Sequence, residues 1–169
     1  LLHCIGDIER ISDHAVNTLE AAEELHRKNL EFSDKAKEEL RIYIAATSEI
    51  VGLAFSAFAT GDIKQAKTVE PLEEVIDNLR NELKKHHVKR LRKGKCTIEA
   101  GFILSDLLTN FERIADHCSN IAVCLIQIQE GSFETHEYIN ELKKTEDAFF
   151  LEKFTGFTQK YALPKKGKD

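Results

Sequence analysis

The sequence contains no methionine and no tryptophan, and only two prolines and eight glycines among its 169 residues. Because proline and glycine interrupt helices, their scarcity favours long uninterrupted helices. No apolar run approaches the roughly 20 residues that a membrane-spanning helix needs, and no signal peptide is visible. The net charge of −5 gives no general attraction to nucleic acid or to anionic lipid.

The four cysteines form neither a C-x-x-C pair nor a zinc-type spacing; they are Cys4, Cys96, Cys118 and Cys124. This pattern is typical of reduced, partly buried thiols in a cytosolic protein. Hydrophobic residues make up 42% of the chain and charged residues 31%, which indicates one globular domain of ordinary size. Period-two alternation and glycine-rich phosphate loops are both missing, so the pattern favours helices throughout.

Apolar residues recur with helical spacing in four long segments. The chain opens inside a helix that runs to about residue 26–30 and carries an apolar stripe of Leu1, Ile5, Ile8, Ala15, Leu19 and Ala22. We expect further helices at about 34–59 after an N-cap at Ser33, at about 62–92 with a kink or break near 69–70 at Pro71, and at about 98–129 after Thr97. Another helix is expected at about 138–161. The prediction is an all-α, antiparallel helical bundle with short loops.

An acidic phrase occurs twice, 103 positions apart, as DIERISDHAVN at 7–17 and NFERIADHCSN at 110–120. In each copy a Glu precedes an Asp by four residues, which places two like charges on one side of a helix, with Cβ atoms about 5–6 Å apart. The segment EEVID at 73–77 repeats that spacing. Because paired carboxylates repel, the recurrence indicates that something cationic compensates.

If the third and fourth helices are antiparallel neighbours, two of these rows face each other. The predicted carboxylate site then consists of Glu73, Asp77, Glu112 and Asp116, with Glu9 and Asp13 as the equivalent row of the first helix. Clustered carboxylates suit Mg²⁺, Ca²⁺, Mn²⁺ or iron. Candidate additional ligands are Asn17, Asn120, His14 and His117. The alternative is an acidic, solvated flank that Arg10, Arg80 and Arg113 partly neutralise.

At these residues the sequence resembles a known family. The two copies of the phrase are similar to the ERIGDHA-x-N signature of the PhoU family, and LEEVIDNLRNEL at 72–83 resembles its other acidic helix. The resemblance implies two three-helix repeats, of which the first two helices of repeat one are missing here. It also implies bound metal ions on the acidic rows, with iron, zinc and nickel as family examples, and a regulator rather than an enzyme.

The end of the chain departs from a free-standing PhoU protein. Residues 132–163 are expected to be a helical extension to a PhoU-like domain at 1–131 (its segments 1–30 and 34–129 belonging to repeats one and two), and 164–169 a disordered tail. This extension, with the phrase LLHCIGDIERISDHAVN, resembles the PhoU-type domain of bacterial sodium/phosphate cotransporters. The resemblance implies a position on the cytoplasmic side of the cell membrane, with the transporter membrane domain in the same polypeptide as partner and no nucleic acid. A free-standing regulator of phosphate uptake and signalling is the alternative.

Three further features of the sequence bear on its function. A ferritin-like di-iron enzyme needs two E-x-x-H motifs, and only Glu23–His26 provides one. The basic run KKHHVKRLRKGK at 84–95 suits acidic lipid headgroups, phosphate or a partner protein, or merely complements a helix end. Apolar surface on the first helix, which lacks its two companion helices, predicts self-association as a homodimer unless the helix around 149–157 folds back over it.

Overall fold

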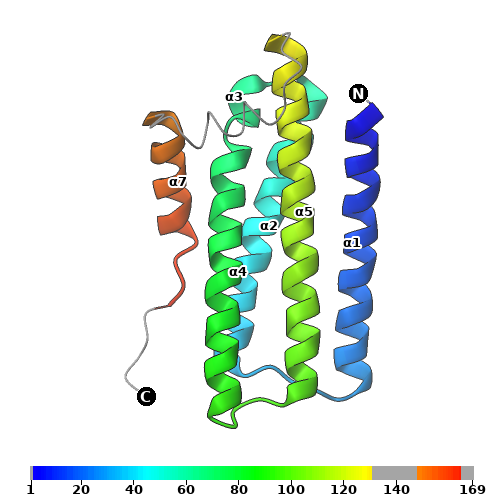
Figure 1. Ribbon diagram of the computed structural model, residues 1–169, viewed down its shortest axis with the longest axis vertical. Coiled ribbons are helices and arrows are strands. Elements are labelled where there is room, and N and C mark those ends of the chain that lie inside the picture. Colours follow the sequence, from blue (N-terminus) through cyan, green and yellow to red (C-terminus); the bar gives the residue numbers. More distant parts are fainter. Residues whose placement is uncertain (1, 131–147, 165–169) are drawn as a thin grey trace.

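Six helices make up the part of the chain that the computed structural model describes, residues 2–130 and 148–164 (Figure 1). They are α1 (Leu2–Arg27), α2 (Asp34–Thr60), α3 (Ile63–Ala66), α4 (Val69–Arg92), α5 (Ile98–Glu130) and α7 (Ala148–Lys160). The long helices α1, α2, α4 and α5 alternate in direction along the bundle. The predicted all-α antiparallel bundle is confirmed.

Local capping chemistry sets the helix ends. Ser33, Asp62 and Thr97 each accept a hydrogen bond from the backbone N–H three residues later, at 3.3, 3.1 and 3.1 Å. Gly61 ends α2 with φ of +69°, a left-handed conformation that glycine adopts without steric cost. These short caps allow neighbouring helices to reverse direction within a few residues.

The predicted break before α4 lies at residues 67–68, two residues earlier than expected. Pro71 occupies the first turn of α4, where a missing N–H costs nothing because these groups have no partner within the helix. The chain therefore completes the short helix α3, turns, and starts α4 with Pro71 inside its first turn.

The core of the bundle lies where α2, α4 and α5 meet. Its largest fully buried apolar side chains are Tyr43, Ile50, Leu72, Ile76, Leu83, Leu108 and Ile121. On α2 and α4 they lie four or seven residues apart, which is the spacing of a single helical stripe. These three helices hold the acidic residues of α4 and α5 in fixed register.

The helix α2 departs from one expectation. By length and composition α2 is apolar enough to cross a membrane, because Glu49 is the only charged residue between positions 42 and 60. The sequence reading that no apolar run approaches this length was therefore wrong. In the bundle, Tyr43, Ala46, Ile50 and Ala54 of α2 are fully buried against other helices, and core helices of soluble proteins meet the same criterion.

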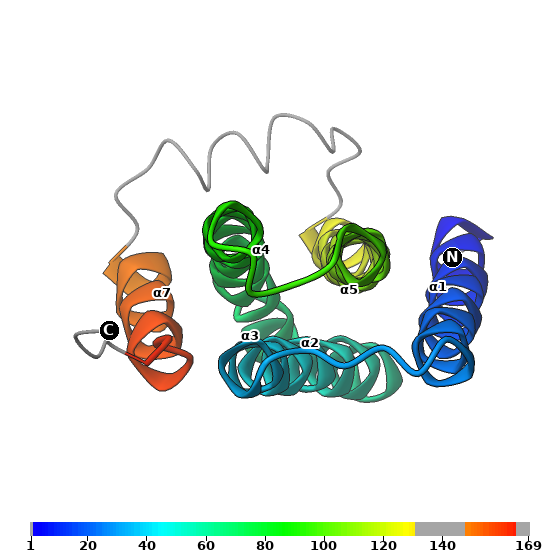
Figure 2. The same cartoon turned by 90° about the horizontal axis from the view of Figure 1, so that it is seen from below.

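The face of α1 that packs against the bundle is not the apolar stripe predicted from the sequence. Ile5 and Leu19 are 58% and 59% exposed, whereas Cys4, Ile11 and Ala21 are buried. The buried residues face α5, the neighbour that α1 contacts most (Figure 2). The predicted stripe of α1 is therefore largely solvent-exposed among the described residues.

Helix α7 packs against α4, on the side of the bundle opposite to α1 (Figure 2). The expectation that this helix could cover the exposed face of α1 was therefore wrong. Lys160 Nζ lies 2.7 Å from Glu49 Oε1 of α2, and the Tyr161 hydroxyl donates to the same carboxylate. The remainder of the predicted helix, at 138–147, lies outside the described residues, and so do residues 165–169 of the disordered tail predicted at 164–169.

Candidate functional site

Two of the predicted acidic rows face each other across α4 and α5. Arg80 Nη1 of α4 lies 3.2 Å from Glu112 Oε1 of α5, and the Ser119 hydroxyl of α5 donates to the Glu70 carboxylate of α4. Because the helices are antiparallel, these two contacts bracket the rows, so that Glu73 and Asp77 lie opposite the turn that holds Glu112 and Asp116. We call these four residues the acidic seam.

The cation within the acidic seam is a guanidinium group. Arg80 Nη1 also lies 3.7 Å from Asp77 Oδ1 of its own helix. The guanidinium therefore stands between one carboxylate of α4 and one of α5. The side chains of Glu112 and Arg80 are only 14% and 20% exposed. Among the described residues, Glu112 Oε2 and Arg80 Nε are buried without a hydrogen-bond partner. One buried carboxylate oxygen of the seam therefore still has capacity for a ligand.

Tyr43 of α2 forms the floor beneath the seam. Its hydroxyl donates to the Leu108 carbonyl at 3.2 Å, and its ring meets Phe111 edge-on with centroids 6.0 Å apart. Burial, followed by the negative charge of Glu112, raises the pKa of Tyr43 well above its ordinary range. The phenol of Tyr43 therefore stays neutral, and its buried ring forms the uncharged floor of the acidic seam.

Asp116 has an electrostatic environment that disfavours its charge. Burial raises the pKa of Asp116, and the nearby charge of Asp77 acts in the same direction. Arg113, whose Nη1 lies 3.0 Å from Asp116 Oδ2, opposes this rise without cancelling it. The carboxylate of Asp116 is thus less stabilised than that of a solvated aspartate.

The donor chemistry of the seam fits a hard cation. It offers carboxylate oxygens from two helices, including the unpartnered Glu112 Oε2. In the described part of the chain, however, His, Cys, Asp and Glu do not converge in a group of three or more that could hold a metal. The guanidinium of Arg80 occupies the place between Asp77 and Glu112, so an ion would have to displace it.

The equivalent row on α1 has different surroundings. Glu9 and Asp13 are exposed, and α5 separates α1 from α4 (Figure 2). The structure therefore does not bring Glu9 and Asp13 together with the acidic seam. A cation on this row would need ligands from outside the described helices.

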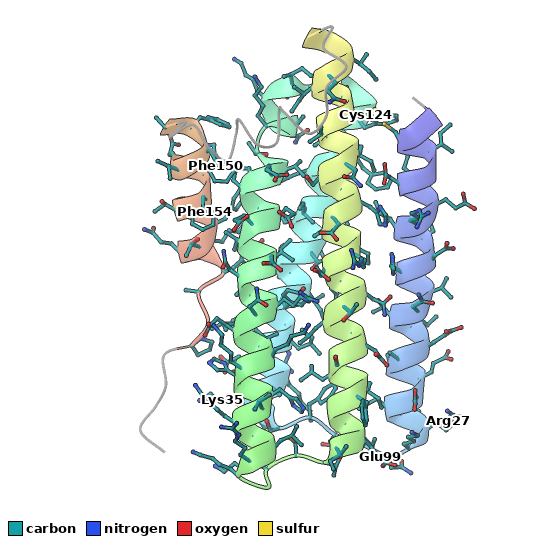
Figure 3. The ribbon with its side chains drawn as sticks, in the orientation of Figure 1. Arg27, Lys35, Glu99, Cys124, Phe150 and Phe154 are labelled. Atoms are coloured by element: carbon teal, nitrogen blue, oxygen red, sulfur yellow. The ribbon has the colours of Figure 1, made fainter. Side chains whose placement is uncertain are left out.

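The four candidate additional ligands lie at the α1–α5 interface. His14 Nδ1 is 2.9 Å from Asn110 Oδ1, and His117 Nδ1 is 2.8 Å from Asp7 Oδ1. Asn17 and Asn120 donate to the same two oxygens, at 3.3 and 3.2 Å. The two histidine rings stack with centroids 5.7 Å apart (Figure 3 shows the side chains between these helices).

This interface has a local two-fold symmetry that follows from the repeat. His14 in the first copy bonds to Asn110, the first residue of the second copy. His117 in the second copy bonds to Asp7, the first residue of the first copy. The symmetry is broken at that residue, which is Asp7 in one copy and Asn110 in the other. Histidine and asparagine of the phrase thus have a structural role in pairing the two copies.

A buried charged cluster between α2 and α4 was missed by sequence reasoning. Glu39, 1% exposed, accepts from Arg90 Nη1 at 2.7 Å and lies 2.8 Å from His86 Nδ1. A signal existed, because Glu39 falls on the buried stripe of α2 between Ala36 and Tyr43. His86 also lines a hollow of about 530 Å³ between α4 and α7, together with Leu79, Phe154 and Tyr161.

Comparison with known proteins identifies a relative and a family. The family profile described as PhoU domain matches residues 40–125, half of the chain. The phosphate-specific transport system accessory protein PhoU homolog 1 of Thermotoga maritima is 28% identical over 131 residues, which are 78% of this chain. The chain spans 56% of the length of that relative. No solved structure matches significantly.

Proposed function

From the premise that this chain belongs to the PhoU domain family, we propose that it is a regulatory domain of phosphate transport on the cytoplasmic side of the membrane. The observation that carries the proposal is the family match over α2 to α5, because this region includes α4 and α5, the two helices that carry the acidic seam. The name of the Thermotoga relative, an accessory protein of a phosphate transport system, supports the same role. The proposal is therefore regulation rather than catalysis.

In the finer form of the proposal, the domain belongs to a sodium/phosphate cotransporter and contacts a membrane domain of the same polypeptide. The resemblance of the first helix and of the C-terminal extension to such transporters supports it. A free-standing regulator of phosphate uptake fits the Thermotoga relative equally well. The sequence upstream of Leu1 discriminates between them, because several apolar runs of about 20 residues indicate a transporter and about 90 soluble residues a free regulator.

The proposed input to this regulation is a cation at the acidic seam. Glu112 and Asp116 would hold it from α5, and Glu73 and Asp77 from α4. A bound divalent or ferric ion, such as Fe, Zn, Ni, Mg or Ca, would supply positive charge there. Arg80 would release Glu112 at the same time, so one local event would exchange an internal ion pair for a ligand.

Such an exchange has a scale that suits regulation. Coupling between two sites is typically about 1–3 kcal/mol. Relief of repulsion among clustered carboxylates is of that order in partly buried surroundings. The domain could therefore shift its docking on a transporter by a factor large enough to change uptake.

The metal proposal predicts that Glu112→Ala with Asp116→Ala removes bound metal from the purified protein. Elemental analysis measures the metal after dialysis against each ion. The matched control is Glu9→Ala with Asp13→Ala, which changes the same residue types on the exposed row of α1. Equal metal content in wild type and the α5 variant would reject the seam as the site.

The regulatory proposal is tested by phosphate uptake. The complete natural protein, with and without residues 1–169, is compared in cells and in liposomes for uptake rate, phosphate affinity and response to metal. We expect uptake without the domain to lose its response to phosphate supply. Unchanged rate, affinity and metal response would reject regulation and favour a role in assembly.

A further inference from the structure

One end of the bundle carries a concentration of positive charge. Seven of the twelve residues from 84 to 95 are lysine or arginine and none is acidic, in a chain whose net charge is −5. This run forms the last turns of α4 and the linker to α5 (Figure 1). We call residues 84–95, together with Ile98 and Phe102 of α5, the basic end.

Much of this charge is not used inside the protein. Arg90 is paired with Glu39, and Lys85 with Glu82. The four other cations of the last turn and linker are exposed and form no ion pair with any described residue; they are Lys89, Arg92, Lys93 and Lys95. Arg27 of α1 and Lys35 of α2 lie at the same end, where Glu99 is a nearby acid (Figure 3).

Two large apolar side chains project next to these cations. Ile98 and Phe102 are each 69% exposed, the highest fraction among the large hydrophobic side chains of the described residues. They stand four residues apart in the first turns of α5, so they lie on the same side of the helix. Single exposed hydrophobic side chains are common on protein surfaces. Neighbouring exposed hydrophobic side chains, such as Ile98 and Phe102, are instead typical of interaction sites.

We propose that the basic end docks on an anionic lipid surface. Lysine and arginine side chains would lie among the headgroups, while Phe102 and Ile98 enter the boundary between headgroups and acyl chains. Each basic residue near such a surface gains attraction from the negative potential of the membrane. A nucleic acid would account for the cations and could stack a base on Phe102, but it would not account for the exposed Ile98.

The negative charge of the acidic seam does not oppose this docking. Ten residues of α5 separate Phe102 from Glu112, a distance of about 15 Å along the helix. The Debye length at physiological salt is about 8 Å, so the acidic seam is screened from a surface that touches the basic end. The proposal also stands apart from the proposed function, because pure lipid vesicles contain no transporter.

The absence of tryptophan provides a direct reporter. Phe102→Trp in the full chain gives a protein whose tryptophan emission comes from one indole at the basic end. We expect its emission to shift to the blue with vesicles of phosphatidylglycerol and phosphatidylcholine, and not with phosphatidylcholine alone. Ile128→Trp, at a 53% exposed position near the other end of α5, is the matched control and should not shift. An unchanged Phe102→Trp spectrum would overturn the insertion.

Vesicle flotation then tests the contributions to affinity. We expect the double variant Ile98→Ser and Phe102→Ser, and separately Lys89→Glu with Lys93→Glu, to bind anionic vesicles at least about tenfold more weakly, with binding lost at high salt. Ile128→Ser and Lys64→Glu, both distant from the basic end, should bind as wild type does. Circular dichroism checks that each variant is folded. Equal binding by all variants, or none by wild type, would overturn the proposal.

Discussion

The acidic phrase occurs on α1 and on α5, and its two copies have opposite surroundings. On α5, Glu112 is mostly buried and paired with Arg80 across the acidic seam. On α1, the equivalent Glu9 is exposed. The apolar residues differ in the same way, because Leu108 is 1% exposed whereas Ile5, which precedes it by the same 103 positions, is 58% exposed.

The difference shows that neighbouring helices, rather than local sequence, determine what each copy does. The copies share the positions that pair α1 with α5, so His14 and His117 have equivalent contacts. The copies differ on a second face. On α5 this face packs against α2 and α4, whereas on α1 no helix among the described residues covers the equivalent face. Matched substitutions in the two copies therefore separate intrinsic effects from effects of packing.

The largest expected contrast is in the core. Leu108→Ala should lower the free energy of unfolding by about 2–5 kcal/mol, because it leaves a cavity among α2, α4 and α5. Ile5→Ala should change it by less than about 0.5 kcal/mol, since the side chain is already exposed. Urea unfolding followed by circular dichroism measures both. Equal losses would mean that self-association covers α1 in solution, and a dependence on protein concentration would then follow.

A smaller contrast is expected for the carboxylates. Glu112→Gln weakens the partner of a largely buried guanidinium and should cost about 1–3 kcal/mol of unfolding free energy. Glu9→Gln should fall within about 0.5 kcal/mol of wild type, as surface substitutions usually do. The same urea titrations provide the measurement. If Glu112→Gln were as stable as wild type, Arg80 would not depend on Glu112 for its charge compensation.

The smallest effect concerns pH and Asp116. Because burial raises its pKa above the ordinary 3.8, the folded protein holds this proton more tightly than the unfolded chain does. Its contribution to stability is therefore present below pH 3.8 and is lost as the pH rises through the folded-state pKa. Asp116→Asn carries no such charge, so it should gain stability relative to wild type between about pH 3 and pH 7.

Thermal unfolding across this pH range measures the Asp116→Asn effect, with Asp13→Asn as the matched variant on α1. A difference between Asp116→Asn and wild type that stays constant with pH would contradict the proposed burial effect. The size of the change is modest because Arg113 already compensates part of the charge.

Much of the fold followed from sequence because it depends on local chemistry. Caps at Ser33 and Thr97 and the left-handed Gly61 mark helix ends through interactions with their own neighbours. The facing acidic rows also followed, since antiparallel helices joined by a short linker must be neighbours. The family resemblance is confirmed by the PhoU domain match, while the transporter context stays a prediction.

What sequence could not provide was the choice among faces and partners. The stripe of Ile5 and Leu19 is as regular as any buried stripe, but it is exposed, because burial depends on which helices are present. The role of Arg80 depends on a rotamer that reaches across to α5. The sequence does not show which charges pair with Glu39, because its partners His86 and Arg90 lie on α4 and are brought beside it only by the fold.

The helix α5 extends over 33 residues without a proline. At about 1.5 Å per residue it spans roughly 50 Å, and Phe102 stands about 21 Å from Asp116 along its axis. The distance between any two positions along such a helix is fixed by its constant rise per residue. Spectroscopic labels on α5 would keep known separations from one another, so a change in distance to a label on α4 would report sliding between the two helices rather than bending of either.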